Sequence, residues 1–117
     1  MSDDEYTVLP LSGEPWLTEA RFYEETWEHI AEEHPEFRLL LPSHRAGLEA
    51  AISDPTIIFA SRTDPERSVV VVSDAFTYFD DPVVVPIRHV AGTSGRVVTA
   101  YFSSTTSGDV LWSAGDD

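Results

Sequence analysis

The sequence predicts an α+β fold in which N-terminal helices pack on a four-stranded antiparallel sheet. Helical patterning is confined to residues 24–53, whereas β-branched and aromatic residues dominate after residue 56. A chain of 117 residues is long enough for one hydrophobic core and too short for two, so we expect a single domain. Within it we expect a flexible arm over residues 1–15, a core over residues 16–104 and a tail over residues 105–117.

The first helix is expected over residues 24–33. It is predicted by a core-facing stripe at i, i+3, i+4 and i+7 spacing, made of Trp27, Ile30, Ala31 and His34. Pro35 disfavours helical geometry at the residue before it and so ends this helix. A second helix is expected from Ser43, a suitable N-cap residue, to the Asp54-Pro55 pair that closes it.

Strand signals fill the rest of the chain. Runs of β-branched and aromatic residues bounded by turn residues predict the four strands at residues 56–61, 68–74 (with an extension to 79), 83–90 and 96–104. Shorter strands are expected at residues 6–9 and 110–112. Pro86 cannot donate a backbone hydrogen bond, so its strand is expected to be an edge or to carry a bulge. Residues 91–95 are expected to form a five-residue hairpin loop.

The net charge of the chain is extreme. It has 21 Asp and Glu residues against seven Arg and no Lys, for a net charge of −14. Such a domain repels itself in dilute buffer. With an ordinary hydrophobic content of 42%, this composition is typical of a protein adapted to a salty cytoplasm, as in halophilic archaea. The alternative is a chain that mimics nucleic acid or binds a basic partner.

The charge is also unevenly distributed. Eleven acids fall within residues 1–36, whereas no acid lies between Asp81 and Asp109. That acid-free stretch contains Arg88, His89 and Arg96. It is explained either as the buried middle of a sheet, where charges are avoided, or as a place where an anion such as phosphate can approach.

Several classes of protein are excluded or disfavoured. The absence of cysteine excludes disulfides, thiolate zinc sites and Cys nucleophiles. The acidic first residues are unlike a signal peptide, and the longest apolar runs are too short to span a membrane. We therefore expect a cytoplasmic protein without a membrane partner.

Two of the four histidines, His29 and His34, lie on or beside the first predicted helix. Histidine suits proton transfer near neutral pH, so this helix is a candidate half of an active site. Other roles stay open: His29 is spaced to lie between Glu25 and Glu33 as a surface cation, and His34 is placed to bond carbonyls at the helix end. His44 and His89 are expected to be structural or exposed, and no metal-ligand spacing is present.

The last long strand is the second informative segment. Strict alternation would place Val98, Ala100 and Phe102 on the core face. The opposite face would then carry a row of hydroxyl groups beginning near Arg96, on Thr99, Tyr101 and Ser103. Such a row suits phosphate binding, although it is also common on any solvated sheet face.

These motifs together resemble a known family. Trp-x-His-Ile, then His-Pro-Glu, then a helix ending in Asp-Pro, then strands closing on Val-Val-Thr-Ala-Tyr are similar to the phage-associated nuclease domains of the barnase–EndoU–colicin–RelE (BECR) superfamily. The resemblance covers residues 21–104. It implies helices on a four-stranded antiparallel sheet and metal-independent RNA cleavage without a cofactor, often as a toxin, an effector or a phage-borne enzyme.

Carried onto this sequence, the resemblance points to His29, His34, Thr99 and Tyr101. Cleavage of RNA without a metal needs a base for the 2′-hydroxyl proton, an acid for the leaving oxygen and donors for the charge on phosphorus. We assign proton transfer to His29 or His34, with Arg88 and Tyr101 as stabilisers. Because the chain has no lysine, Arg62, Arg88 or Arg96 would have to hold the phosphate. Substrate binding is assigned to Arg62 and Arg96 together with Thr99 and Ser103 of the hydroxyl row.

Two other classes of function stay open. One is a catalytically silent module on the same fold that binds RNA or a protein. The other is an acidic inhibitor that occupies a basic site on another protein. The partners expected from the nuclease hypothesis are RNA and a cognate antitoxin or immunity protein.

The charge predicts how stability depends on salt. We expect the folded state to be more stable in molar KCl than in dilute buffer, because at about 1 M salt the Debye length falls to roughly 3 Å and screens most of the self-repulsion. Refolding at graded KCl concentrations, followed by circular dichroism, measures this. Full stability in dilute buffer would contradict the adaptation to high salt.

Overall fold

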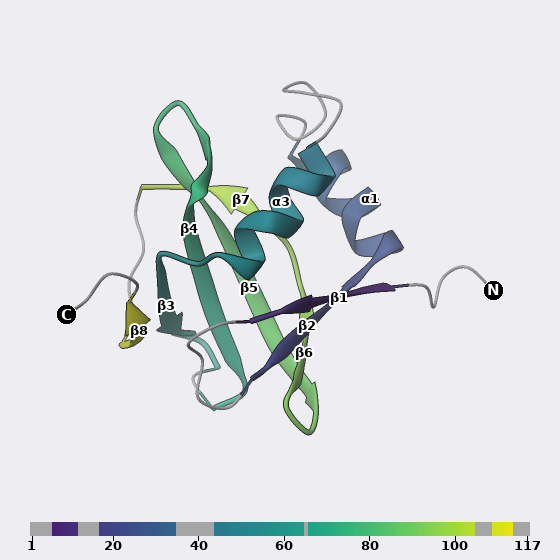
Figure 1. Cartoon of the computed structure of the whole chain (residues 1–117), viewed down its shortest axis with the longest axis vertical. Helices are drawn as coiled ribbons and strands as arrows, with labels where there is room; N and C mark the ends of the chain where they lie inside the picture. The colour runs from purple at the N-terminus through teal and green to yellow at the C-terminus, as the bar shows by residue number, and fades with distance from the viewer. Residues whose placement is uncertain (1–5, 12–16, 35–43, 65, 105–108, 114–117) are drawn as a thin grey trace.

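Among the residues that the structure describes, the framework is one mixed sheet of eight strands, not the expected sheet of four antiparallel strands (Figure 1). The computed structural model describes residues 6–11, 17–34, 44–64, 66–104 and 109–113. The strands are β1 (Tyr6–Pro10), β2 (Glu19–Tyr23), β3 (Ile57–Ala60), β4 (Ser68–Tyr78), β5 (Asp81–Ala91), β6 (Ser94–Val97), β7 (Tyr101–Phe102) and β8 (Val110–Ser113). Their order in the sheet is β1-β2-β6-β5-β4-β3-β8, and β7 pairs with β5 outside this path. The α+β class is confirmed.

The expectation that helices come before the strands is wrong. β1 and β2 precede α1 (Glu24–Glu33), and β2 lies parallel to β6, so the sheet is mixed. β2 was not predicted because it is only five residues long and places just Ala20 and Phe22 in the core. The bounds of α1 match the prediction, and α3 (His44–Ser53) begins one residue later than expected.

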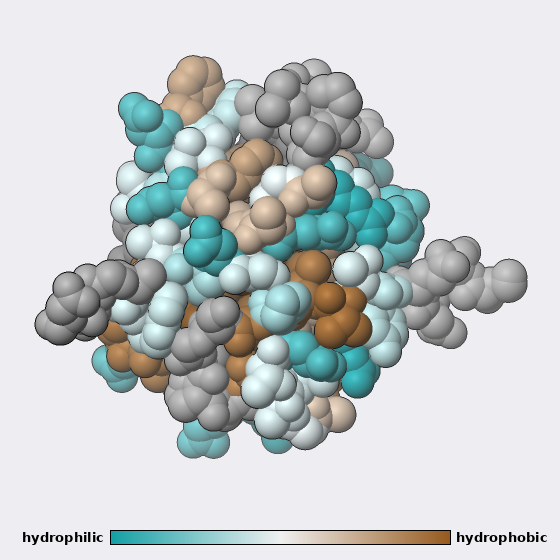
Figure 2. Space-filling view, viewed as in Figure 1, coloured by the Kyte–Doolittle hydropathy of each residue, from teal (hydrophilic) through white to brown (hydrophobic). Residues whose placement is uncertain are grey.

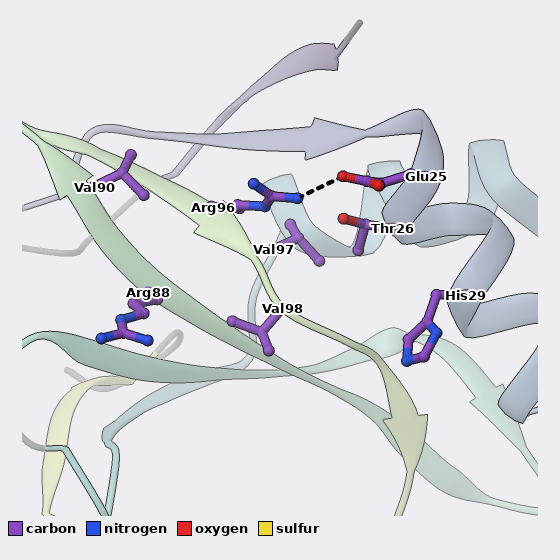
Figure 3. A pocket seen from close by; sticks show the side chains of 8 residues that line it. All are labelled: Glu25, Thr26, His29, Arg88, Val90, Arg96, Val97 and Val98. Atoms are coloured by element: carbon purple, nitrogen blue, oxygen red, sulfur yellow. Dashed lines mark hydrogen bonds and ion pairs between the residues drawn. The ribbon is translucent and has the colours of Figure 1, made fainter. Parts of the chain in front are cut away.

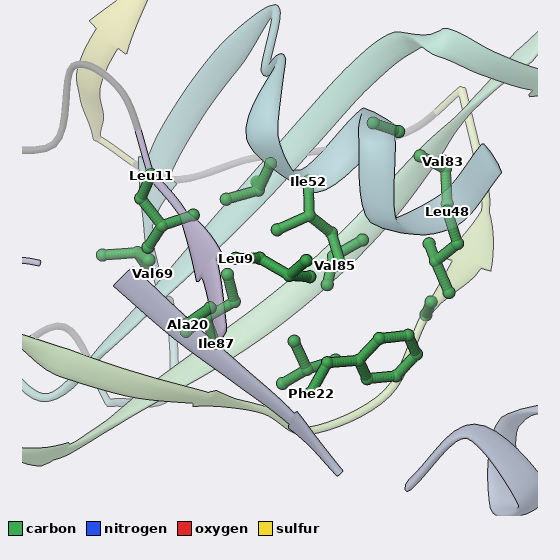
Figure 4. Close-up of a cluster of buried hydrophobic side chains, with 14 of the residues drawn as sticks. Leu9, Leu11, Ala20, Phe22, Leu48, Ile52, Val69, Val83, Val85 and Ile87 are labelled. Carbon is green, nitrogen blue, oxygen red and sulfur yellow. The ribbon is translucent and has the colours of Figure 1, made fainter. Parts of the chain in front are cut away.

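The core lies between α3 and the sheet, which coils around this helix (Figures 1 and 4). α3 contacts β4, β5 and β1, so strands from both halves of the sheet meet on one helix. Its core face and the sheet residues beneath it are fully buried, including Leu48, Ile52, Val69, Val85 and Ile87. Burial of each such side chain contributes about 1.5–3 kcal/mol, which makes α3 the main stabilising element of this face.

Arg45 links α1 and α3. Its guanidinium forms an ion pair with Glu24 of α1 and a second, at 3.3 Å, with Glu49 of α3, and it lies 5.5 Å from the ring centre of Phe22. Burial disfavours the charged guanidinium, but the hydrogen bonds and charges of the two glutamates outweigh this cost and raise the pKa of Arg45 above its ordinary value. Arg45 therefore stays charged and holds the start of α1 against α3.

The predicted strand at residues 96–104 is interrupted opposite Pro86. In the β5–β6 register, Ile87 pairs with Val97, so Pro86 and Val98 form the next pair. Val98 donates its N–H to the Pro86 carbonyl at 3.0 Å, but Pro86 has no N–H to return the second bond. Pro86 thus lies in an interior strand, which corrects the expected edge position. The alternative of a bulge is met, because β5 carries a register shift between His89 and Ala91.

One extra residue in this interruption changes which side chains share a face. β6 and β7 pair with β5 in registers that differ by one residue, because Val97 pairs with Ile87 whereas Tyr101 pairs with Val84. Val98 is consequently 48% exposed, whereas Ala100 is fully buried. The expectation that Val98 shares the core face with Ala100 is wrong, and Arg96 and Tyr101 come to lie on the same outer face.

The β5–β6 turn and the two ends of the chain differ from the prediction. The expected five-residue loop is a two-residue turn, Gly92-Thr93, because β6 already begins at Ser94. β1 pairs with β2 and β8 pairs with β3, so parts of the predicted arm and tail belong to the sheet. Within the described residues, no helix combines the length and the apolar character needed to cross a membrane.

Two glycines give a matched test of the packing. At Gly95 an added Cβ would lie 2.6 Å from Ile87 Cγ2, so Gly95→Ala is expected to destabilise the fold by about 1–3 kcal/mol. At Gly47 in α3 the same methyl group would meet Phe76 at 3.4 Å, an ordinary contact, and Gly47→Ala is expected to stabilise by up to about 1 kcal/mol through helix propensity. Urea unfolding measures both. Equal changes in the free energy of unfolding for Gly95→Ala and Gly47→Ala would contradict this packing.

Candidate functional site

An open groove of about 480 Å³ lies on the outer face of the sheet, the face opposite α3 (Figure 3). One wall and the floor come from β5 and β6 with the residue that follows β6, which contribute Arg88, Val90, Arg96, Val97 and Val98. The other wall comes from α1, which contributes Glu25, Thr26 and His29. The groove therefore combines an apolar floor with cationic, anionic and imidazole side chains from segments far apart in the sequence.

Three arginines form a row across neighbouring strands. Arg88 of β5 is the direct partner of Arg96 in β6, and Arg96 is the direct partner of Arg21 in β2. Direct partners project from the same face, and like charges in this position are destabilising on a scale of about 0.2–1 kcal/mol. Concentrating three of only seven arginines of a very acidic chain in one row violates a local stability rule, which is typical of a functional site.

The three arginines differ in how their charge is compensated. Arg96 Nη2 lies 3.2 Å from Glu25 Oε1, and its guanidinium lies 4.1 Å from the ring centre of Tyr23. Arg21 lies 5.3 Å from the ring centre of Tyr6, and its buried Nε has no hydrogen-bond partner among the described residues. Arg88 is exposed and forms no ion pair within the described part of the chain. Arg88 is thus the cation best placed to receive an anion.

His29 projects from α1 into the groove, one helical turn after Glu25 (Figure 3). Its Nε2 lies 3.3 Å from Glu33 Oε2, and its side chain is 56% exposed. The sequence interpretation places His29 between Glu25 and Glu33. In the structure His29 contacts Glu33, whereas Glu25 pairs with Arg96. Glu33 orients the imidazole and leaves Nδ1 as the ring nitrogen that can face a ligand.

The other two predicted catalytic residues, His34 and Tyr101, form a separate pair. Their ring centres are 6.2 Å apart, with the planes inclined by 32°. His34 follows the last residue of α1, where its backbone N–H donates to the Ile30 carbonyl at 2.8 Å. Neither residue is among those that line the groove. The four predicted catalytic residues therefore divide into His29 with Arg88 and His34 with Tyr101.

Of the predicted substrate-binding residues, only Arg96 lines the groove. Arg62 is exposed in the turn after β3, Thr99 is half-buried in the interruption between β6 and β7, and the Ser103 N–H donates to the Pro82 carbonyl at 3.2 Å. Sequence reasoning missed Glu25 as a groove residue. The signal was present, because Glu25 and His29 have the i, i+4 spacing of one helix face.

His89 does not line the groove. His89 Nε2 lies 2.8 Å from the Gly92 carbonyl oxygen, consistent with the expected structural role at the β5–β6 turn. The side chain of His44 lies outside the described residues. In the described part of the chain, no group of three or more His, Asp or Glu side chains is arranged to hold a metal ion.

No family model, curated protein or solved structure matches the chain. The similarity to BECR nucleases therefore stays a prediction carried by the short motifs, and the function must be argued from the groove itself.

Proposed function

We propose that the protein binds the phosphodiester backbone of an RNA strand in the groove and cleaves it without a metal ion. The observation that carries this proposal is the in-register Arg88–Arg96 pair on one side of a groove that has His29 on the other. Two guanidinium groups on adjacent strands present several N–H donors to one phosphate, the arrangement in which arginine binds phosphate best.

The groove contains both groups needed for proton transfer. Glu25 and His29 lie one helical turn apart on α1, and both face the groove. A carboxylate can accept the proton of a 2′-hydroxyl, and an imidazolium can donate a proton to the leaving 5′-oxygen. When phosphate binds Arg96, it takes the place of Glu25 in the ion pair and leaves that carboxylate available as the base.

This assignment changes the roles predicted from the sequence. His29 and Arg88 keep proton transfer and phosphate binding, and Glu25 joins them as the base. His34 and Tyr101, which pair with each other outside the groove lining, take no part in this assignment. Val90 and Val98, which are 44% and 48% exposed, supply an apolar surface for a sugar or base.

The net charge of −14 bears on the conditions for binding. In dilute buffer, an RNA strand is repelled by the acids of α1, of which Glu28 and Glu32 lie beside His29. At about 1 M salt this repulsion is screened beyond roughly 3 Å, whereas hydrogen bonds to phosphate and apolar contacts persist. We therefore expect binding and cleavage to be strongest in concentrated KCl, unlike that of ordinary basic nucleases.

The test is cleavage of a single-stranded RNA in molar KCl with EDTA. His29→Ala and Glu25→Gln are expected to lower the rate constant by about 100-fold or more, the range of a lost acid or base. Arg88→Ala is expected to weaken RNA binding as well as cleavage. Arg67→Ala is the matched control, because Arg67 is exposed and does not line the groove, and it is expected to leave both unchanged.

Three results would contradict the nuclease proposal. Unchanged cleavage by His29→Ala would exclude its role in proton transfer. Binding by the wild-type chain without cleavage would identify a silent RNA-binding module on the same fold. Absence of binding at every salt concentration would favour the acidic inhibitor, for which the glutamates of α1 supply a surface.

A further inference from the structure

The hairpin of β4 and β5 projects beyond the rest of the sheet (Figure 1). β3 pairs with β4 only as far as Val72, and β7 pairs with β5 only at Val83 and Val84. Among the described residues, no third strand lies beside the last pair of the hairpin, Tyr78 and Asp81. The tip is therefore free of the packing that determines side-chain choice elsewhere in the sheet.

Phe79, at the tip of this hairpin, is unfavourable for folding in both its backbone conformation and its exposure to solvent. Phe79 and Asp80 form the two-residue turn with φ values of 51° and 71°, a left-handed conformation for which Asn-Gly is the favoured sequence. A bulky aromatic residue is rare in this conformation. The Phe79 side chain is also 84% exposed, more than any other large hydrophobic residue in the described part of the chain. Neither backbone geometry nor burial explains a phenylalanine here.

A column of aromatic rings supports Phe79 from below. Its ring centre lies 4.5 Å from that of Tyr78, which lies 5.5 Å from Phe102. Phe102 in turn lies 5.4 Å from Phe76, which packs against Gly47 of α3. The exposed ring is thus connected through ring-to-ring contacts to the core, which favours a preorganised position of the kind a binding anchor needs.

Acidic residues flank the ring and restrict what it can contact. Asp74 and Asp80 are exposed and Asp81 is half-buried, and the 20 residues between Arg67 and Arg88 contain no cation. Figure 2 shows apolar surface at the hairpin tip with strongly hydrophilic surface beside it. The tip offers no cation to pair with the phosphates of nucleic acid or anionic lipid, and a second copy of a chain with seven Arg against 21 acids offers few cations to pair with its carboxylates.

We propose that Phe79 is the anchor of a protein-binding surface and inserts into an apolar pocket of a positively charged partner. Asp80 and Asp81 then pair with Lys or Arg side chains at the rim of that pocket, where charge complementarity contributes to association rate and specificity. An aromatic residue that fills a pocket at the centre of such a contact carries most of the binding free energy. The hairpin tip does not include the groove, so this proposal is independent of the nuclease proposal.

The experiment places a photo-crosslinking phenylalanine analogue at position 79 of the full chain, in cells that express it. The same analogue at position 110 is the matched control, because Val110 is 55% exposed on the edge strand β8. A protein that crosslinks from position 79 and not from position 110 is then purified, and its affinity for the uncrosslinked chain is measured by titration calorimetry. Crosslinking identifies a candidate partner, and the titration determines whether that partner binds through Phe79.

We expect Phe79→Ala to weaken binding at least tenfold and Val110→Ala to leave it unchanged. The double variant Asp80→Asn with Asp81→Asn is expected to weaken binding several-fold and to reduce its dependence on salt. Phe79→Asn distinguishes the loss of a contact with the partner from a loss of stability, because asparagine tolerates the left-handed conformation while removing the aromatic ring. It is expected to raise the melting temperature while losing as much affinity as Phe79→Ala.

Any of four results would overturn the proposal. Crosslinking from position 79 at no more than the level from position 110 would exclude a partner at the tip. Equal affinity of the partner for Phe79→Ala would exclude the anchor. Sedimentation that shows a dimer lost in Phe79→Ala would assign the tip to self-association. Binding to phosphatidylcholine vesicles that is lost in Phe79→Ala would assign it to a lipid surface.

Discussion

At Pro86 the ladder between β5 and β6 loses one of the two hydrogen bonds that its register calls for, and the outer face of the sheet depends on this loss. Val98 still donates to the Pro86 carbonyl, but the chain gains one residue before β7 resumes pairing. That extra residue places Tyr101 on the same face as Arg96 and Val98, although strict alternation along the strand would place it on the opposite face.

The charges of the molecule are organised around the same face. A row of three arginines lies across β2, β6 and β5 of a chain that has only seven, and among the described residues only the central one, Arg96, forms an ion pair. Glu25 pairs with Arg96, whereas Arg88 has no such partner within the described residues. An anion held between Arg88 and Arg96 would relieve the repulsion between them, which is why the proposed site accepts the cost of pairing two like charges.

The sequence predicts the parts of the fold that long periodic patterns specify. α1, α3, β3, β4 and β5 lie where the stripes and apolar runs place them, because burial of those side chains decides both pattern and structure. β2 and the interruption after Val97 could not be predicted, because one is a short strand in an acidic segment and the other arises from a proline in a different strand. The same holds for the groove: Arg88, Arg96 and His29 were recognised one by one, but the register that pairs the arginines is a property of the sheet.

The central claim is that Arg88 and Arg96 together hold a phosphate opposite His29. It is tested most directly by titrating the ¹⁵N-labelled chain, in molar KCl, with a 2′-O-methyl RNA dinucleotide that cannot be cleaved. The predicted result is that the largest chemical-shift changes occur at the Nε of Arg88 and Arg96 and in the His29 ring, while Arg67 is unchanged. Shifts centred on Arg67 or Arg62, or shifts that survive when Arg88 and Arg96 are both replaced by alanine, would contradict it.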